Sequence, residues 1–188
     1  MSKSILGRLG KAYAAFQDIR AQAYRVSQDV LRLSKHAIFA LHHGGDAESA
    51  ALLKKADAAF TQLKRLWKRD SRIRFEGSTR AALEEYVESR TYWSVVKSGK
   101  IVDIPDAFDE EYIAGLADLT GELVRRAVMV ATEGGQPEFD RLYRSVREIV
   151  GALHTFPLTG YVRQKADDAK RNLHKIEDLR LHLNARHQ

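Results

Sequence analysis

Two pairs of carboxylates stand out by their spacing. Glu85 and Glu88 are three residues apart, and Asp118 and Glu122 are four residues apart. On a helix, residues at these separations share a face, so each pair projects to one side. A helical wheel places both pairs off the apolar stripe of their own segments. The spacing therefore predicts that four carboxylates on two successive helices meet across one groove.

Four carboxylates in one groove repel one another, and burial adds a desolvation cost that a divalent cation offsets. The available ligands are hard oxygens, since there is no cysteine and no histidine at a matching offset, which favours Mg²⁺ or Mn²⁺ over zinc or iron. The Glu-x-x-Glu spacing differs from the Glu-x-x-His of di-iron bundles, which argues against oxygen chemistry. The alternative is an ordinary solvated face on which Glu122 pairs with Arg125 or Arg126.

A basic run at the end of the second expected helix is the candidate nucleic-acid interface. Its members are Lys64, Arg65, Lys68, Arg69, Arg72 and Arg74. Clusters of this kind neutralise phosphate backbones, and Trp67 within the run is available to stack on an unpaired base. The alternative is a solubilising surface with Trp67 turned into the core.

Composition limits the class of protein. The 188 residues are 44% hydrophobic and 30% charged, with a net charge of +6 and a pI near 9.5. These values predict one soluble globular domain over residues 1–188 and make a polyanionic partner plausible. The absence of cysteine excludes disulfides, thiol catalysis and cysteine-ligated metals, and suits a cytoplasmic protein. No apolar stretch is long enough to span a bilayer, and no nucleophilic triad or glycine-rich phosphate loop is recognisable.

The elements that would position these residues are all helical. Apolar residues recur at three- and four-residue steps, which predicts helices rather than strands. We expect breaks at 42–45, 98–108, 134–135 and 156–158, with Asp46 capping the second helix and Asp106 or Asp109 capping the fourth. The predicted fold class is an all-α, single-domain antiparallel bundle of about six to seven helices.

The sequence resembles the translin family, in particular its translin-associated factor X branch. The similarity is densest at Glu85-Tyr86-Val87-Glu88 and at 115–123, which reads Gly-Leu-Ala-Asp-Leu-Thr-Gly-Glu-Leu. Segments 33–42 and 163–171 also resemble the opening and closing helices of that family. The resemblance covers nearly the whole chain in order.

This resemblance implies protomers that assemble into a closed hollow homo-oligomer, an octamer or hexamer, enclosing RNA or single-stranded DNA. It also implies a Mg²⁺-dependent endoribonuclease centre at Glu85, Glu88, Asp118 and Glu122, because all four carboxylates of the factor X branch are present. A metal-bound hydroxide would attack the phosphorus, and the basic run would hold the backbone without reading bases. The alternative is a non-catalytic, translin-like protein that binds single-stranded RNA or DNA.

Overall fold

The computed structural model describes the backbone of residues 2–186 and the side chains of residues 4–185. This part of the chain forms six α-helices and one short 3-10 helix, and it contains no strand. Their bounds are α1 (Ser2–His42), α2 (Asp46–Arg69), η1 (Ser71–Phe75), α3 (Gly77–Ser98), α4 (Asp109–Thr132), α5 (Gln136–Thr155) and α6 (Gly160–Arg186). The prediction of an all-α bundle of about six to seven helices is confirmed.

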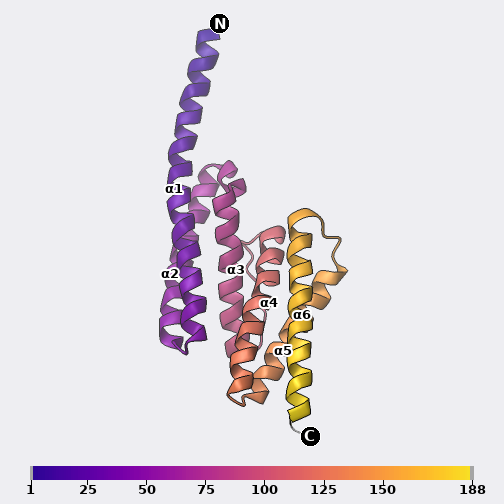
Figure 1. Cartoon of the computed structure of the whole chain (residues 1–188). Coiled ribbons are helices and arrows are strands. Elements are labelled where there is room, and N and C mark those ends of the chain that lie inside the picture. Colours follow the sequence, from indigo (N-terminus) through magenta and orange to yellow (C-terminus); the bar gives the residue numbers. More distant parts are fainter. Residues whose placement is uncertain (1, 187–188) are drawn as a thin grey trace.

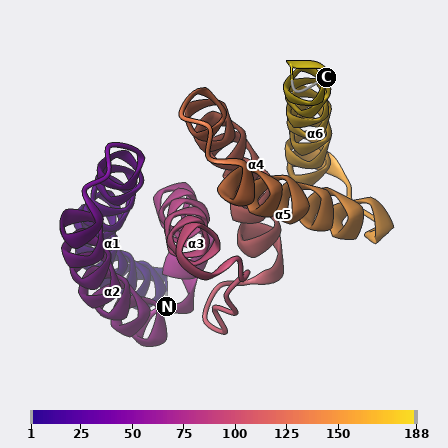
Figure 2. The same cartoon turned by 90° about the horizontal axis from the view of Figure 1, so that it is seen from below.

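Helix α3 lies in the middle of the bundle. Helices α1 and α2 pack on one side of it, and α4, α5 and α6 lie on the other (Figure 1). Seen along the bundle axis, α1 and α2 form one pair and α5 crosses beside α4 and α6 (Figure 2). The central helix therefore faces both halves of the molecule, and each half carries one side of any groove that opens along it.

The apolar core has two parts that meet on α3. One part joins α1, α2, η1 and α3 through residues such as Phe60, Leu63 and Leu83. The other joins α3 to α4, α5 and α6 through residues such as Tyr92 and Leu123. Because α3 contributes to both, its backbone is fixed from two sides, which gives the side chains on its remaining face a rigid support.

Glycines end the helices where the sequence predicts breaks. Gly44, Gly99 and Gly134 adopt positive φ angles of 74°, 71° and 75°, which a residue without a Cβ reaches at no steric cost. The predicted caps were wrong: the N-cap positions are Gly45 and Phe108, so Asp46 and Asp109 lie one position too late and Asp106 lies two positions too early. Asp46 and Asp109 are the first helical residues of α2 and α4, where their charges still favour the positive helix end.

Candidate metal and nucleic-acid site

Gly115 sets the close approach of α3 and α4. A Cβ built at Gly115 would lie 2.6 Å from the carbonyl oxygen of Glu84 and 2.8 Å from the Cβ of Val87. Both distances are shorter than real Cβ contacts allow, so only glycine fits at this crossing. Asp118 follows Gly115 by three residues, so it projects from α4 close to the crossing.

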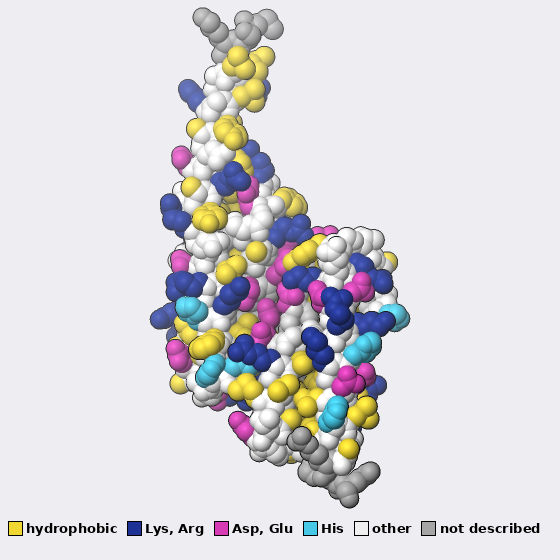
Figure 3. Space-filling model, viewed as in Figure 1, with side chains coloured by type: hydrophobic (Ala, Val, Ile, Leu, Met, Phe, Trp, Pro, Cys, Tyr) yellow, Lys and Arg dark blue, Asp and Glu magenta, His cyan; other side chains and the backbone are white. Residues whose placement is uncertain are grey.

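The four predicted carboxylates line one groove, which we call the acidic groove. Glu85 and Glu88 come from α3, while Asp118 and Glu122 come from α4. The groove has a volume of about 480 Å³ and is completed by Lys35, Ile38, Phe39 and Arg125. In Figure 3 acidic side chains gather along the centre of the face, with basic side chains on both sides. The convergence predicted from helical spacing therefore occurs.

Glu88 is the most enclosed of the four carboxylates. Only 8% of this residue is exposed, and no hydrogen bond or ion pair of its side chain is present in the described part of the chain. Burial raises its pKa well above the usual value, and the negative charges of Glu85, Asp118 and Glu122 raise it further. Burial likewise raises the pKa of Glu85, against the opposing effect of Lys35. Glu88 is thus the carboxylate of the groove that has no basic partner among the described residues.

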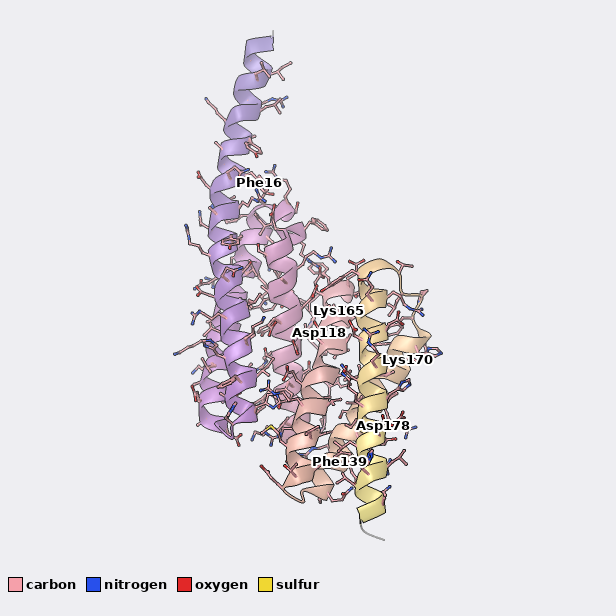
Figure 4. All side chains as sticks on the ribbon, in the orientation of Figure 1. Phe16, Asp118, Phe139, Lys165, Lys170 and Asp178 are labelled. Carbon is pink, nitrogen blue, oxygen red and sulfur yellow. The ribbon has the colours of Figure 1, made fainter. Side chains whose placement is uncertain are left out.

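The other two carboxylates are held by basic side chains from distant helices. Lys165 of α6 donates a hydrogen bond of 2.5 Å to Asp118 (Figure 4). Burial by itself would lower the pKa of Lys165, but the hydrogen bond and charge of Asp118, together with the interactions with Tyr161, outweigh burial and raise the pKa. On the other side, the Nε2 atom of His42 lies 2.5 Å from a carboxylate oxygen of Glu122. This hydrogen bond lowers the pKa of Glu122.

His42 is itself fixed by a second contact. Its side chain is fully buried, and its Nδ1 atom lies 3.0 Å from the hydroxyl of Tyr92. The consistent arrangement is that Tyr92 donates to Nδ1 while the Nε2–H group donates to Glu122. This Tyr92–His42–Glu122 chain holds the carboxylate in one orientation, as outer-shell hydrogen bonds do around metal ligands.

The donor set fits a hard divalent cation in chemistry and charge. All four carboxylates face one groove, and the raised pKa of Glu88 reports negative charge that a cation would offset. As the side chains stand, no three acidic or histidine groups in the described part of the chain are close enough to hold a metal together. To hold an ion together, Asp118 would have to exchange its contact with Lys165 for the ion, and Glu122 would keep its hydrogen bond with His42.

The profile of the Translin family matches residues 18–187. This chain belongs to the translin family. It is also similar to the Translin-associated protein X homolog of Schizosaccharomyces pombe, with 25% identity over an alignment of 154 residues that covers 73% of this chain. The match spans 65% of the length of that relative.

Solved structures show the same fold at low sequence identity. The complex of AfC3PO with duplex RNA superposes with a TM-score of 0.86 at 21% identity, covering 96% of each chain. Apo-NeC3PO gives a TM-score of 0.85 at 16% identity, covering 95% of this chain and 96% of that one. The translin-family fold of the present chain is thereby confirmed along almost its full length.

Sequence reasoning anticipated Arg125, which lies 3.8 Å from Glu122 in the structure, but it missed the basic partners that come from distant helices. Lys165 lies 47 residues from Asp118, and His42 lies 80 residues from Glu122, so no local spacing announces either pair. Glu84 was missed as well, although its four-residue separation from Glu88 was a usable signal. Burial raises the pKa of Glu84, and its side chain accepts a hydrogen bond of 2.7 Å from Tyr161.

The basic run is dispersed rather than gathered. Arg74 is buried, pairs with Glu111 at 3.0 Å and stacks on Phe108, which argues against it as a phosphate contact. Lys64 and Arg72 are paired with nearby aspartates. The side chains that remain exposed with no ion pair in the described part of the chain are Arg65, Lys68 and Arg69.

Trp67 packs against two other aromatic side chains. The Trp67 ring packs edge-on against Phe60 and Phe108 at centroid distances of 5.9 Å and 6.4 Å, so it supports the core rather than facing a base.

Among the helices described, none combines the length and the apolar character needed to cross a bilayer.

Proposed function

We propose that this protein is a Mg²⁺-dependent endoribonuclease of the translin-associated factor X type, with Mn²⁺ as an alternative ion. The observation that supports this most is the surroundings of Glu88. It is buried in the groove where Glu85, Asp118 and Glu122 also lie, and the charges of all three raise its pKa. Maintaining such repulsion costs stability, and a bound cation would reverse that cost.

Each side chain around the groove has a role that its contacts suggest. Glu85, Glu88, Asp118 and Glu122 would hold the ion, and one of them would act as general base. When bound, the ion supplies a water of lowered pKa and screens charge on the phosphate. His42 and Tyr92 orient Glu122 through their hydrogen bonds.

Basic residues at the groove suit the phosphate of the substrate. Lys35 and Arg125 line the groove, and Lys165 reaches it from α6. Asp118 would hold the ion in place of Lys165, whose ammonium would then be available to the phosphate of the substrate. Positively charged groups placed where negative charge develops lower the barrier to phosphoryl chemistry.

The substrate class and assembly extend this proposal. The structural neighbour AfC3PO is seen with duplex RNA, which supports short RNA as the ligand of the present chain. We propose that the RNA is enclosed by a closed homo-oligomer in the cytoplasm, with single-stranded DNA as a further ligand. Exposed Arg65, Lys68 and Arg69 would contact its backbone without base readout.

The alternative is a non-catalytic protein that binds RNA or single-stranded DNA. The pairing of Asp118 with Lys165 favours it, because an aspartate neutralised by a lysine has less need of a metal. The two functions differ in what Mg²⁺ does to the protein and to the RNA.

Replacing Asp118 with Asn distinguishes the endoribonuclease from the non-catalytic binding protein. We expect Asp118→Asn to reduce Mg²⁺-dependent cleavage of short RNA by a factor of about 10³ or more, while RNA binding persists. In the parent protein, Mg²⁺ at about 100 times its dissociation constant should add about 2.7 kcal/mol to the free energy of unfolding, and the variant should lose that gain. Asp178→Asn on an exposed part of α6 is the matched control (Figure 4). Equal cleavage by parent and Asp118→Asn, or cleavage that survives EDTA, would contradict the enzyme assignment.

A further inference from the structure

Phe39 is an exposed aromatic residue near the end of α1. Its neighbours Ile38 and Ala40 are 7% and 5% exposed, whereas Phe39 itself is 58% exposed. A single exposed apolar side chain is ordinary in a protein, so the position of this one is what matters. Phe39 lines the acidic groove together with the four carboxylates, and it is the aromatic residue among the described residues of that lining.

The side chain of Phe39 also lines a second hollow. This hollow has a volume of about 380 Å³, and its other lining residues are His36, Ala40, His43, Gly45, Glu48 and Leu52. In Figure 3 histidine and hydrophobic side chains lie together on the α1 side of the acidic side chains. Phe39 therefore stands where the acidic groove and the second hollow meet, and a flat molecule lying on its ring would have open space beside it.

His43 supports the ring of Phe39 from one helical turn away. The two rings pack obliquely, with their centroids 4.2 Å apart and their planes at 33°. The Nδ1 atom of His43 lies 2.8 Å from the carbonyl oxygen of Phe39. Because a carbonyl oxygen only accepts hydrogen bonds, Nδ1 carries the hydrogen and donates it. The phenyl ring is thus held in place before any ligand arrives, which lowers the entropy lost when a ligand stacks on it.

The charges around Phe39 suit a nucleotide. Lys35 precedes Phe39 by four residues, so their side chains are neighbours on the helix, about 5–6 Å apart at the Cβ atoms. Lys35 is exposed and lies 3.7 Å from Glu85, and Arg125 lines the same groove from α4. A cation next to an exposed ring can contact the phosphate of a nucleotide while the ring contacts its base. Both groups lie beside the carboxylates that are proposed to hold the ion.

The polar surroundings of Phe39 favour a base over an apolar occupant. The acidic groove and the second hollow are lined by lysine, arginine, histidine and glutamate side chains as well as by the ring. By contrast, the hollow between the 103–109 connection and the end of α5 is lined mostly by apolar side chains. An amphipathic helix or a lipid surface needs a continuous apolar face, which one ring among charges does not offer. A nucleobase combines an apolar face with polar edges.

We propose that Phe39, backed by His43, stacks on the base of the nucleotide next to the scissile phosphate. This rests on the proposed nuclease function and adds a substrate-binding residue to it. A base inside a continuous duplex is covered on both faces, so the base on Phe39 is at a strand end, unpaired or turned out of the stack. Every base has a face that can stack on a ring, so the contact positions the phosphate without selecting a sequence.

Short RNA that carries one abasic ribose tests the contact in the full chain with Mg²⁺. Removing the base next to a cleaved bond should slow cleavage of that bond by the parent about 5- to 150-fold, the range expected for one base–aromatic stack. Phe39→Leu keeps the apolar bulk without the ring, so it should cleave intact RNA more slowly and no longer respond to the abasic site. Phe39→Tyr keeps the ring and should behave like the parent, as should the control Phe156→Leu, at an exposed residue outside the acidic groove. A Phe39→Leu variant that responds to the abasic site as the parent does would overturn the proposal.

Photo-cross-linking separates this contact from the nuclease assignment. RNA containing 5-iodouridine is bound to the protein in EDTA and irradiated, which joins the base to an aromatic side chain stacked on it. We expect the adduct at Phe39, with a yield about tenfold or more lower in Phe39→Leu. An adduct at Phe39 without Mg²⁺-dependent cleavage would refute the nuclease but support the stack. Adducts confined to the basic run would overturn the stack. So would a Phe39→Leu variant that cross-links as the parent does but has a lower assembly mass by light scattering, because a second copy would then cover the ring.

Discussion

The acidic groove and the basic run differ in how sequence proximity becomes spatial proximity. The four carboxylates come from segments about thirty residues apart, yet they line one groove. The basic run is nearly contiguous, yet its members separate into a buried ion pair, two further ion pairs and three exposed side chains. Charges on one helix face are gathered by packing, whereas charges in consecutive positions are spread around the helix.

The acidic groove and the basic run also differ in how completely their charges are neutralised by neighbouring side chains. In the basic run, Lys64, Arg72 and Arg74 each pair with an acidic side chain. In the acidic groove, Asp118 and Glu122 pair with Lys165 and His42 from other helices, and Glu122 also lies 3.8 Å from Arg125 of its own helix. Glu85 has Lys35 at 3.7 Å, so Glu88 is the one carboxylate of the four with no basic partner among the described residues. A buried carboxylate without a partner is a candidate for ligand binding, whereas the paired cations are already compensated.

The largest expected effect comes from separating α3 and α4, the two helices that bring the four carboxylates together. Gly115→Ala would drive a methyl group into the backbone of α3 at Glu84 and force the helices apart. We expect a loss of about 1–3 kcal/mol in unfolding free energy, and misplacement by about 1 Å should cost about 10²-fold in cleavage rate. Thermal unfolding and an RNA cleavage assay measure the two effects.

Gly121→Ala is the matched control in the same helix. A Cβ there meets its nearest neighbour, the side-chain nitrogen of Asn172, at an ordinary 3.5 Å. Alanine should therefore be tolerated and should stabilise the helix by up to about 1 kcal/mol. If the two glycine variants behave alike, the α3–α4 crossing does not position the carboxylates.

Arg74→Ala tests whether the basic run includes a structural member. Its guanidinium pairs with Glu111, whose side chain is 4% exposed and which would keep only Arg80 as a partner. Removing one member of a buried pair should cost about 3 kcal/mol in urea unfolding. Arg163→Ala, which breaks an exposed pair within α6, should change little. If Arg74→Ala were as stable as the parent but bound RNA more weakly, Arg74 would be an RNA-contacting residue rather than a structural one.

The fold was predictable because its signals are local. Helix ends follow Gly44-Gly45, Gly99 and Gly134, whose left-handed conformations depend on the residue itself. The N-caps of α2 and α4 were predicted at aspartates, but the observed N-cap residues are Gly45 and Phe108, neither of which makes a side-chain capping hydrogen bond. Asp46 and Asp109 lie one position later, in the first turn of each helix.

The site was predictable only in part. Helical spacing is enough to place Glu85, Glu88, Asp118 and Glu122 on shared faces, because it depends on the period of one helix. The pairs of Lys165 with Asp118 and of His42 with Glu122 depend on which helices become neighbours. His42 looked like part of a helix end, and it is indeed the last residue of α1, but its burial beside Tyr92 has no local signature.

Removing the exposed members of the basic run has a moderate expected effect. The triple variant Arg65→Ala, Lys68→Ala, Arg69→Ala should weaken RNA binding uniformly across sequences. The slope of log affinity against log salt should fall by about 1 for each phosphate contact that is lost. Lys54→Ala with Lys55→Ala, two exposed residues earlier on α2, is the control. If this pair has the same effect, the protein's net charge rather than the run carries the binding.

The smallest effect, and the most direct measure of charge in the acidic groove, is the pH dependence contributed by Glu88. Because burial and three carboxylates raise its pKa in the folded state, folded protein holds this proton more tightly than unfolded protein does. Stability is therefore lost as pH rises from the unfolded pKa through the folded one, and it stays low above that. Glu88→Gln removes the charge that causes the loss.

In metal-free protein at pH 8, the variant should melt above the parent, by about 2–4 °C for each 1 kcal/mol of repulsion relieved. The difference should shrink toward pH 5, and Mg²⁺ should stabilise the parent but not the variant. A variant that melts below the parent at pH 8 would show that Glu88 is compensated, and the contrast between the two regions would then fail.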